Sequence, residues 1–100
     1  MDMGTSGRKL PVIDIRKTGQ NITRMRKERD ISVRELQIMF GFASPQAIYN
    51  WQNGNSLPSV DNFIVLATIL GTTIDEIIAI EGEEDSDDSE ESILWPQLLS

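Results

Sequence analysis

The chain has 100 residues, with nine Lys or Arg against sixteen Asp or Glu, and therefore a net charge of −7. It contains neither Cys nor His, which excludes a disulfide framework, a thiolate nucleophile and a Cys-ligated zinc, and removes the commonest general base and metal ligand. No apolar run approaches the roughly 20 residues of a membrane span, and the first residues lack the apolar core of a signal peptide. We therefore expect a soluble cytoplasmic protein that is not an enzyme and needs no metal or cofactor.

The net charge is the average of two very different parts. All nine basic residues lie between positions 8 and 34, where they outweigh three acids and give +6. Residues 81–100 hold eight acids and no Lys or Arg, so they carry −8, and residues 1–80 carry +1. The total argues against a nucleic-acid partner. The first eighty residues, however, are close to neutral and have a basic N-terminal flank.

The N-terminal residues 1–17 are predicted to form a flexible basic arm, because their first ten positions are rich in Gly, Ser and Thr. Residues 11–15 are rich in β-branched side chains and have strand character. Without an obvious partner strand, we expect this segment to be extended and to lay Val12, Ile13 and Ile15 against the core.

The remaining sequence indicates a helical domain over residues 18–80 and an acidic tail over residues 81–100. The domain contains five short amphipathic segments, each bounded by capping or turn residues, which predicts a compact all-α fold. Residues 81–92 are acidic and of low complexity, so they cannot bury enough apolar surface to become ordered. The apolar segment Ile93–Leu99 follows them.

The first two helices are marked by their caps. Thr18 is expected to N-cap the first helix, which ends at Asp30. Ser32 begins the second, with Glu35 three residues on as a capping box, and Gly41 suits the left-handed residue just past its end. The apolar positions predicted to face the core are Ile22 and Met25 in the first helix, and Leu36, Met39 and Phe40 in the second.

Three further helices follow in the same way. Ser44 and Pro45 predict the start of the third, as a capping hydroxyl followed by Pro at the first helical position. Ser59 caps the fourth helix, and Thr73 with Glu76 forms a second capping box for the fifth. The inward positions are Ala47, Ile48 and Trp51 in the third, Phe63, Leu66, Ala67 and Leu70 in the fourth, and Ile74, Ile77 and Ile78 in the fifth, where core and dimer contacts are both expected.

The second and third predicted helices, joined by a short turn at Gly41, have the layout of a helix-turn-helix. In such a motif the second helix must be apolar on one side and must present short polar groups on the other. The outward positions of the third helix are Gln46, Tyr49, Asn50 and Asn53. Gln and Asn bond bidentately to adenine in the major groove, and the amide groups at helix starts are seats for phosphate. The motif therefore predicts DNA binding.

These residues and their spacings resemble the Cro/lambda-repressor type of helix-turn-helix, also called the xenobiotic-response-element family. The resemblance implies a five-helix domain and a sequence-specific DNA-binding transcription regulator, acting as a homodimer on pseudo-palindromic double-stranded DNA. The matching positions are Gly19, Ile22, Met25, Arg26, Ile31, Ser32, Glu35, Leu36, Gly41, Ile48, Trp51, Gln52, Gly54, Pro58, Ser59, Leu66, Ala67, Leu70, Gly71, Ile74, Asp75, Glu76 and Ile77.

Placed on this sequence, the resemblance and the outward pattern together give each candidate residue a role. The candidate base-reading residues are Ser44, Gln46, Tyr49, Asn50 and Asn53. The candidate phosphate contacts are Ser32, Arg34, Asn53 and Asn55. Arg26 and Gln52 are assigned to structure, as a hydrogen-bonded pair.

Three departures from the family pattern concern the geometry of the motif. The family usually has Glu at the position of Gln52, where it pairs with the arginine that matches Arg26. It favours Ala at the position of Gln37, because a small residue lets the two helices approach. The stretch from Gly41 to Ile48 is also one residue longer than usual. The last two departures predict an extended turn and a slightly shifted third helix.

Other interpretations stay open at this point. The polar face of the third helix could be an ordinary solvated surface, and residues 35–80 contain no Lys or Arg to attract phosphate. The acidic tail fits either a solubilising segment or an anionic competitor for the basic flank. The segment Ile93–Leu99 fits either disorder or docking in a groove of its own chain or of another. The alternative function is an interaction module on the same fold, antitoxin-like or adaptor, that uses this segment to hold a partner.

Overall fold

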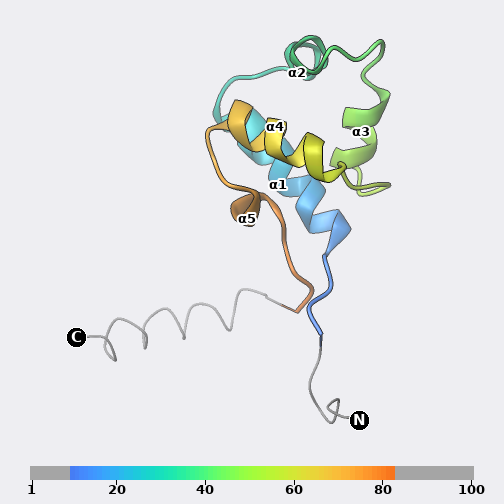
Figure 1. The fold of residues 1–100 in the computed structure, drawn as a ribbon, viewed down its shortest axis with the longest axis vertical. Helices are drawn as coiled ribbons and strands as arrows, with labels where there is room; N and C mark the ends of the chain where they lie inside the picture. Colours follow the sequence, from blue (N-terminus) through green and yellow to red (C-terminus); the bar gives the residue numbers. More distant parts are fainter. Residues whose placement is uncertain (1–9, 83–100) are drawn as a thin grey trace, which may run out of the picture. The chain divides into compact units, whose positions relative to one another are not determined.

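The computed structural model describes residues 10–82, and this part of the chain forms five helices. In Figure 1, α1 and α4 lie at the centre of the view, α2 at the top, α3 at the right and α5 at the lower left. The all-α fold expected from the sequence is confirmed. The helices are α1 (Ile15–Glu28), α2 (Val33–Phe40), α3 (Gln46–Gln52), α4 (Val60–Leu70) and α5 (Ile74–Ile77).

Helix α1 begins four residues earlier than the sequence predicted. Its N-cap is Asp14, whose Oδ1 accepts the N–H of Lys17 at 2.9 Å. The prediction that Thr18 caps this helix is therefore wrong. Thr18 is fully buried inside the first turns, where its hydroxyl accepts the N–H of Ala79 at 3.0 Å. A hydroxyl that bonds a distant backbone group cannot be told from a capping hydroxyl by local pattern alone.

The start of α1 also shortens the predicted N-terminal arm, residues 1–17. Ile15 and the next two residues are helical, so the extended segment stops at Asp14. The side chains of Val12 and Ile13 are 52% and 37% exposed, so these two residues do not pack into the core as expected.

Helix α2 has the capping box that the sequence predicted. The N–H of Glu35 donates to Ser32 Oγ at 2.9 Å, and the N–H of Ser32 donates to Glu35 Oε1 at 2.8 Å. Gly41 follows the helix in the left-handed conformation, with φ of 74°. Of the predicted inward positions, Leu36 is fully buried, but Met39 is 55% exposed. The prediction for Met39 is wrong because α2 turns only a narrow stripe toward the core.

Helix α3 begins at Gln46, one residue after the predicted start. Pro45 occupies the cap position, and no side chain caps the helix. The Ser44 hydroxyl instead accepts the N–H of Gln46 at a long 3.4 Å, which corrects the expectation that Ser44 is the N-cap. Ile48 and Trp51 are buried, as predicted from their spacing.

Helices α4 and α5 follow the sequence prediction closely. Ser59 caps α4 through the N–H of Asn62, and all four predicted inward positions of α4 are buried. Thr73 caps α5 through the N–H of Glu76, but the Glu76 carboxylate accepts the hydroxyl of Thr72 instead of completing a capping box. In α5, Ile77 is fully buried.

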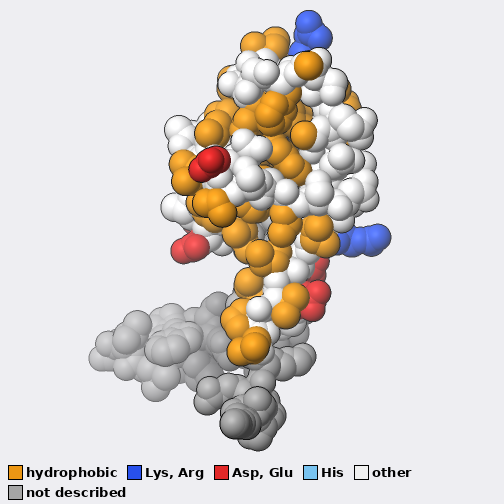
Figure 2. All heavy atoms as spheres, turned by 45° about the vertical axis from the view of Figure 1, so that its right-hand side comes forward, with side chains coloured by type: hydrophobic (Ala, Val, Ile, Leu, Met, Phe, Trp, Pro, Cys, Tyr) orange, Lys and Arg blue, Asp and Glu red, His pale blue; other side chains and the backbone are white. Residues whose placement is uncertain are grey.

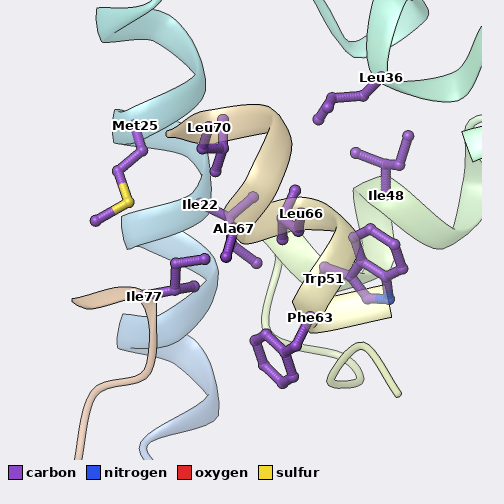
Figure 3. Close-up of a cluster of buried hydrophobic side chains, with 10 residues drawn as sticks. All are labelled: Ile22, Met25, Leu36, Ile48, Trp51, Phe63, Leu66, Ala67, Leu70 and Ile77. Carbon is purple, nitrogen blue, oxygen red and sulfur yellow. The ribbon is translucent and has the colours of Figure 1, made fainter. Parts of the chain in front are cut away.

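The buried side chains form one cluster between the helices. Figure 3 shows that they come from all five helices and converge around Ile22 and Leu66. Trp51 brings α3 into this cluster, and Ile77 brings in α5. The cluster consists of Ile22, Met25, Leu36, Ile48, Trp51, Phe63, Leu66, Ala67, Leu70 and Ile77.

The chain consists of two structural units. One is the helical unit, Ile13–Ala79. The other combines the two flanks, and its described part is residues 10–12 and 80–82, where the N–H of Glu81 donates to the carbonyl of Val12 at 2.7 Å. The acidic run beyond Gly82 and the segment Ile93–Leu99 lie outside the described residues.

Candidate nucleic-acid interface

The polar face of α3 lies opposite its buried face. Gln46 and Asn53 are exposed and Tyr49 is 43% exposed, whereas Ile48 is fully buried. Asn50 is half-buried at the middle of the helix. The structure therefore brings the predicted base-reading side chains of α3 to one side of a helix that the core holds from the other side.

Two of these amides are hydrogen-bonded to each other. Nε2 of Gln46 donates to Oδ1 of Asn50 at 3.2 Å, across one turn of the helix. The bond fixes the rotamers of both side chains. It leaves Oε1 of Gln46, one of its N–H groups and the NH2 group of Asn50 available for other partners. This pairing was not anticipated from the sequence, although the i, i+4 spacing of the two amides is the signal that could have shown it.

Helix α3 is held against α1 by backbone contact. A Cβ added at Gly19 of α1 would lie 2.3 Å from the carbonyl oxygen of Trp51 and 2.7 Å from that of Gln52. A glycine is therefore required at position 19, because any side chain there would push α3 away. Beyond the end of α3, Gly54 has φ of 77° and its added Cβ would lie 2.9 Å from Cα of Arg16. The two glycines set the distance between the helices at both points.

A side-chain hydrogen bond between Arg26 and Gln52 also joins α1 to α3. Nε of Arg26 donates to Oε1 of Gln52 at 2.9 Å, and Nη1 of Arg26 donates to the carbonyl of Ile31 at 3.0 Å. One half-buried guanidinium thus links α1, the end of α3 and the residue that precedes the cap of α2. Such a bond lacks charge complementarity, because the Gln amide is neutral.

The candidate phosphate contacts occupy two places. Asn53 and Asn55 are exposed just beyond α3, where the N–H of Asn55 donates to the carbonyl of Asn50 at 2.8 Å. At the start of α2, Arg34 is exposed, but the N–H of Ser32 donates to Glu35 and Ser32 Oγ accepts the N–H of Glu35, so only the hydroxyl proton of Ser32 is left to donate. The sequence showed this capping box, and the box leaves Ser32 with less to offer a phosphate than expected.

The basic residues of the described range lie outside α3. Every Lys and Arg in the described range belongs to α1, to the residue after it, or to α2 at Arg34. Glu28 forms exposed ion pairs with Arg24 and Arg29, both at 3.4 Å. Figure 2 turns the α3 side forward and shows mostly uncharged side chains, with Lys and Arg at its upper and right-hand edges.

Three basic side chains have no hydrogen bond or ion pair within the described range: Arg16, Lys27 and Arg34. All three are exposed. They are the cations best placed to meet an external anion, since surface ion pairs would otherwise share their charge.

The described residues hold neither a metal-binding cluster nor a membrane-spanning helix. Between residues 10 and 82, no group of three or more acidic side chains could hold a metal ion. No helix in this range is long and apolar enough to cross a membrane.

Comparisons with known proteins identify the fold. A model of the helix-turn-helix family matches residues 22–77. The crystal structure of the restriction-modification controller protein C.AhdI from Aeromonas hydrophila is similar, with 25% identity, a TM-score of 0.58, and coverage of 64% of this chain and 96% of that one. The DNA-binding domain of BldD shares the fold at 14% identity and a TM-score of 0.56, covering 65% of this chain and 93% of that one. No curated protein matches the chain.

The chain belongs to the helix-turn-helix family, because the family model covers more than half of it. The resemblance to the Cro/lambda-repressor type is therefore confirmed. Within that class, the protein is a DNA-binding transcription regulator and not an enzyme.

Proposed function

We propose that the protein binds DNA sequence-specifically by inserting α3 into the major groove. The bonded pair of Gln46 and Asn50 carries this proposal, because it presents two ordered amides on the exposed side of a helix whose other side is fixed in the core. Ser44, Tyr49 and Asn53 complete the reading face. A preorganised face loses little conformational entropy on binding.

The proposed readout follows from the groups left available. Oε1 of Gln46 can accept from the N6 amine of an adenine while its second N–H donates to N7 of the same base, and the amide of Asn50 can serve a neighbouring base. Because Asn50 sits in the middle of the helix and is half-buried, it contacts DNA only if α3 lies deep in the groove. Both amides therefore favour sites that contain adenine.

The affinity in this proposal comes mainly from outside α3. Arg34 at the start of α2 and the polar groups of Ser32, Asn53 and Asn55 seat phosphates, and the free cations of α1 add long-range attraction. Since residues 35–80 have no Lys or Arg, we expect few phosphate contacts and modest affinity for random DNA. The site of action is the cytoplasm, where such a regulator meets DNA.

We further propose that the protein acts as a homodimer, with a second copy of the chain on the exposed apolar face of α4. Val60, Ile64 and Val65 of this helix are 72%, 51% and 40% exposed. Figure 2 shows apolar side chains gathered over the middle of the helical unit. Ile77 is fully buried and cannot contribute, but Ile74 and Ile78 are half-buried. A twofold dimer would read half-sites about 34 Å apart.

A selection from random double-stranded DNA tests this function. The full chain should enrich an adenine-containing, pseudo-palindromic site. On that site, Gln46→Ala should cost about 1–3 kcal/mol of binding free energy and relax discrimination at one base pair. Gln20→Ala, an exposed amide on α1, is the matched control and should change nothing. If Gln46→Ala binds all sequence variants as the unmodified protein does, Gln46 is not part of the readout.

The uncharged surface of α3 also supports the alternative, a protein-interaction module on the same fold. A salt titration separates the two functions. Binding to DNA falls steeply as salt rises, because bound cations are released from the phosphates. A protein partner held by the apolar segment Ile93–Leu99 would be nearly indifferent to salt.

A further inference from the structure

The turn between α2 and α3 is attached to α2 by one side chain. Nε2 of Gln37 donates to the carbonyl oxygen of Phe42 at 3.2 Å, and the N–H of Phe42 donates to the carbonyl of Gln37 at 3.0 Å. Two hydrogen bonds thus tie the same two residues. The second is the usual bond across a left-handed helix end such as Gly41. The first exists only because residue 37 has an amide at the end of a flexible side chain.

The ring of Phe42 carries this attachment to α3. It stacks on Phe40, the last residue of α2, with ring centroids 5.0 Å apart, and meets Trp51 of α3 edge-on at 5.9 Å. Phe40 and Trp51 are also edge-on, at 5.4 Å. Arrangements of this kind contribute specific orientation as well as burial. Gln37 therefore fixes a residue whose ring packs against both helices of the motif.

Few other hydrogen bonds hold the start of α3. No side chain caps the helix, and Pro45 has no N–H to donate. Residues 42–45 of the described chain make one other hydrogen bond before those of the helix itself. It is the long bond between Ser44 Oγ and the N–H of Gln46. The position of Gln46 relative to α2 thus depends on where the turn is held.

We propose that Gln37 is a positioning residue that sets the placement of α3 against α2, and with it the base pairs that Gln46 and Asn50 reach. Gln37 does this through Phe42 and does not itself touch DNA. The longer turn and the amide at position 37 work together: the extra residue carries the chain outward, and the amide ties it back. This inference rests on the proposed reading of DNA by α3.

The variant Gln37→Met tests the attachment, because it keeps the length of the side chain and removes the donor. Nuclear Overhauser contacts between the rings of Phe42 and Trp51 report the turn without any DNA. They should be strong in the unmodified protein and at least twofold weaker in the variant. Ile38→Ala, at an exposed neighbour on α2, is the matched control and should leave them unchanged. Unchanged ring contacts in Gln37→Met would overturn the proposal.

The second readout is DNA binding by the same variants. Gln37→Met should bind the selected site about tenfold more weakly and discriminate less among its single-base variants. Its affinity for random DNA should not change, because the phosphate contacts are intact. An equal loss on selected and random DNA would show a general structural role and would also overturn the proposal. If Gln37→Met does not fold, Gln37→Leu replaces it, which is also uncharged and has no donor, with the same expected results.

Gln46→Ala, measured in parallel, separates this inference from the function on which it rests. If Gln46→Ala leaves discrimination intact, the reading of DNA by α3 fails. The ring contacts still decide whether Gln37 holds the turn. If Gln46→Ala relaxes discrimination and Gln37→Met does not, the function stands and the positioning role fails.

Discussion

Helices α1 and α3 pack on each other yet carry different halves of what DNA binding requires. Helix α1 holds most of the positive charge of the described chain. Helix α3 has no charged residue and offers two ordered amides. In the proposed function, affinity and specificity are therefore assigned to separate helices, which are joined by close backbone contacts at Gly19 and Gly54 and by the bond from Arg26 to Gln52.

This division explains why a net charge of −7 is compatible with DNA binding. The charge relevant to phosphate is local, because at physiological salt a charge is screened within about 8 Å. What matters is that the cations lie beside α3 and that no acid lies on it.

The largest expected effect comes from breaking the contact that joins the two helices. In Gly19→Ala, the added Cβ would meet the carbonyl of Trp51 at 2.3 Å, and the neighbour is backbone that cannot move aside. We expect the free energy of unfolding to fall by about 3 kcal/mol. Urea denaturation followed by circular dichroism measures it.

Gln20→Ala supplies the control for this variant, since it lies next in α1 and is exposed. It should change the stability by no more than about 0.5 kcal/mol. Equal stability of Gly19→Ala and the unmodified protein would mean that α1 and α3 are not held at this distance.

A smaller change in stability is expected from strengthening the bond between Arg26 of α1 and Gln52 of α3. Gln52→Glu would turn the bond from Arg26 into a charge-assisted one without changing its length. We expect a gain of about 0.5–1 kcal/mol in the free energy of unfolding at neutral pH. This gain in stability should be lost as the pH falls to about 3, where the introduced carboxyl becomes protonated. The stabilisation requires the ionised carboxylate, so it is present only at higher pH.

Denaturation of Gln52→Glu at the two pH values checks this. A loss of stability at neutral pH would show that the burial of the new charge outweighs its pairing with Arg26. Binding to DNA should be unaffected, since Gln52 is on the α1 side of α3.

The smallest effect concerns the cations alone. Arg34→Gln should weaken binding to all DNA sequences by the same factor and lower the slope of log affinity against log salt by about 1. Arg24→Gln is the matched control, because Arg24 is already paired with Glu28. A change in sequence preference for Arg34→Gln would contradict the division of labour between the helices.

The sequence was sufficient for the elements whose signals are local. The caps at Ser32 and Ser59 and the buried stripe of α4 follow from spacing alone, and all three were predicted. The error at Thr18 arose because a buried hydroxyl can serve a residue sixty-one positions away, which local pattern does not encode. The error at Met39 arose because the width of the buried face depends on how the neighbouring helices pack.

In the candidate site, too, the features with local signals were predicted and those that depend on the tertiary structure were not. Residue types and spacing predicted the polar face of α3, and the resemblance to the family predicted the pairing of Arg26 with Gln52. The bond between Gln37 and Phe42 could not be predicted, because it depends on the path of the turn that follows Gly41. The commitment of Ser32 to Glu35 was visible in the sequence, but its consequence for phosphate binding required the geometry.

The most direct test of the account is to locate the start of α3 on DNA. The chain has no Cys, so Ala43→Cys, in the exposed turn before α3, places a single DNA-cleaving iron chelate beside the reading face. Asp75→Cys, on α5, is the control, because Figure 1 shows α3 and α5 on opposite sides of α1. We predict cleavage within the selected site from position 43 and little from position 75. Equal cleavage from both positions, or cleavage from position 75 alone, would contradict the placement of α3 in the groove.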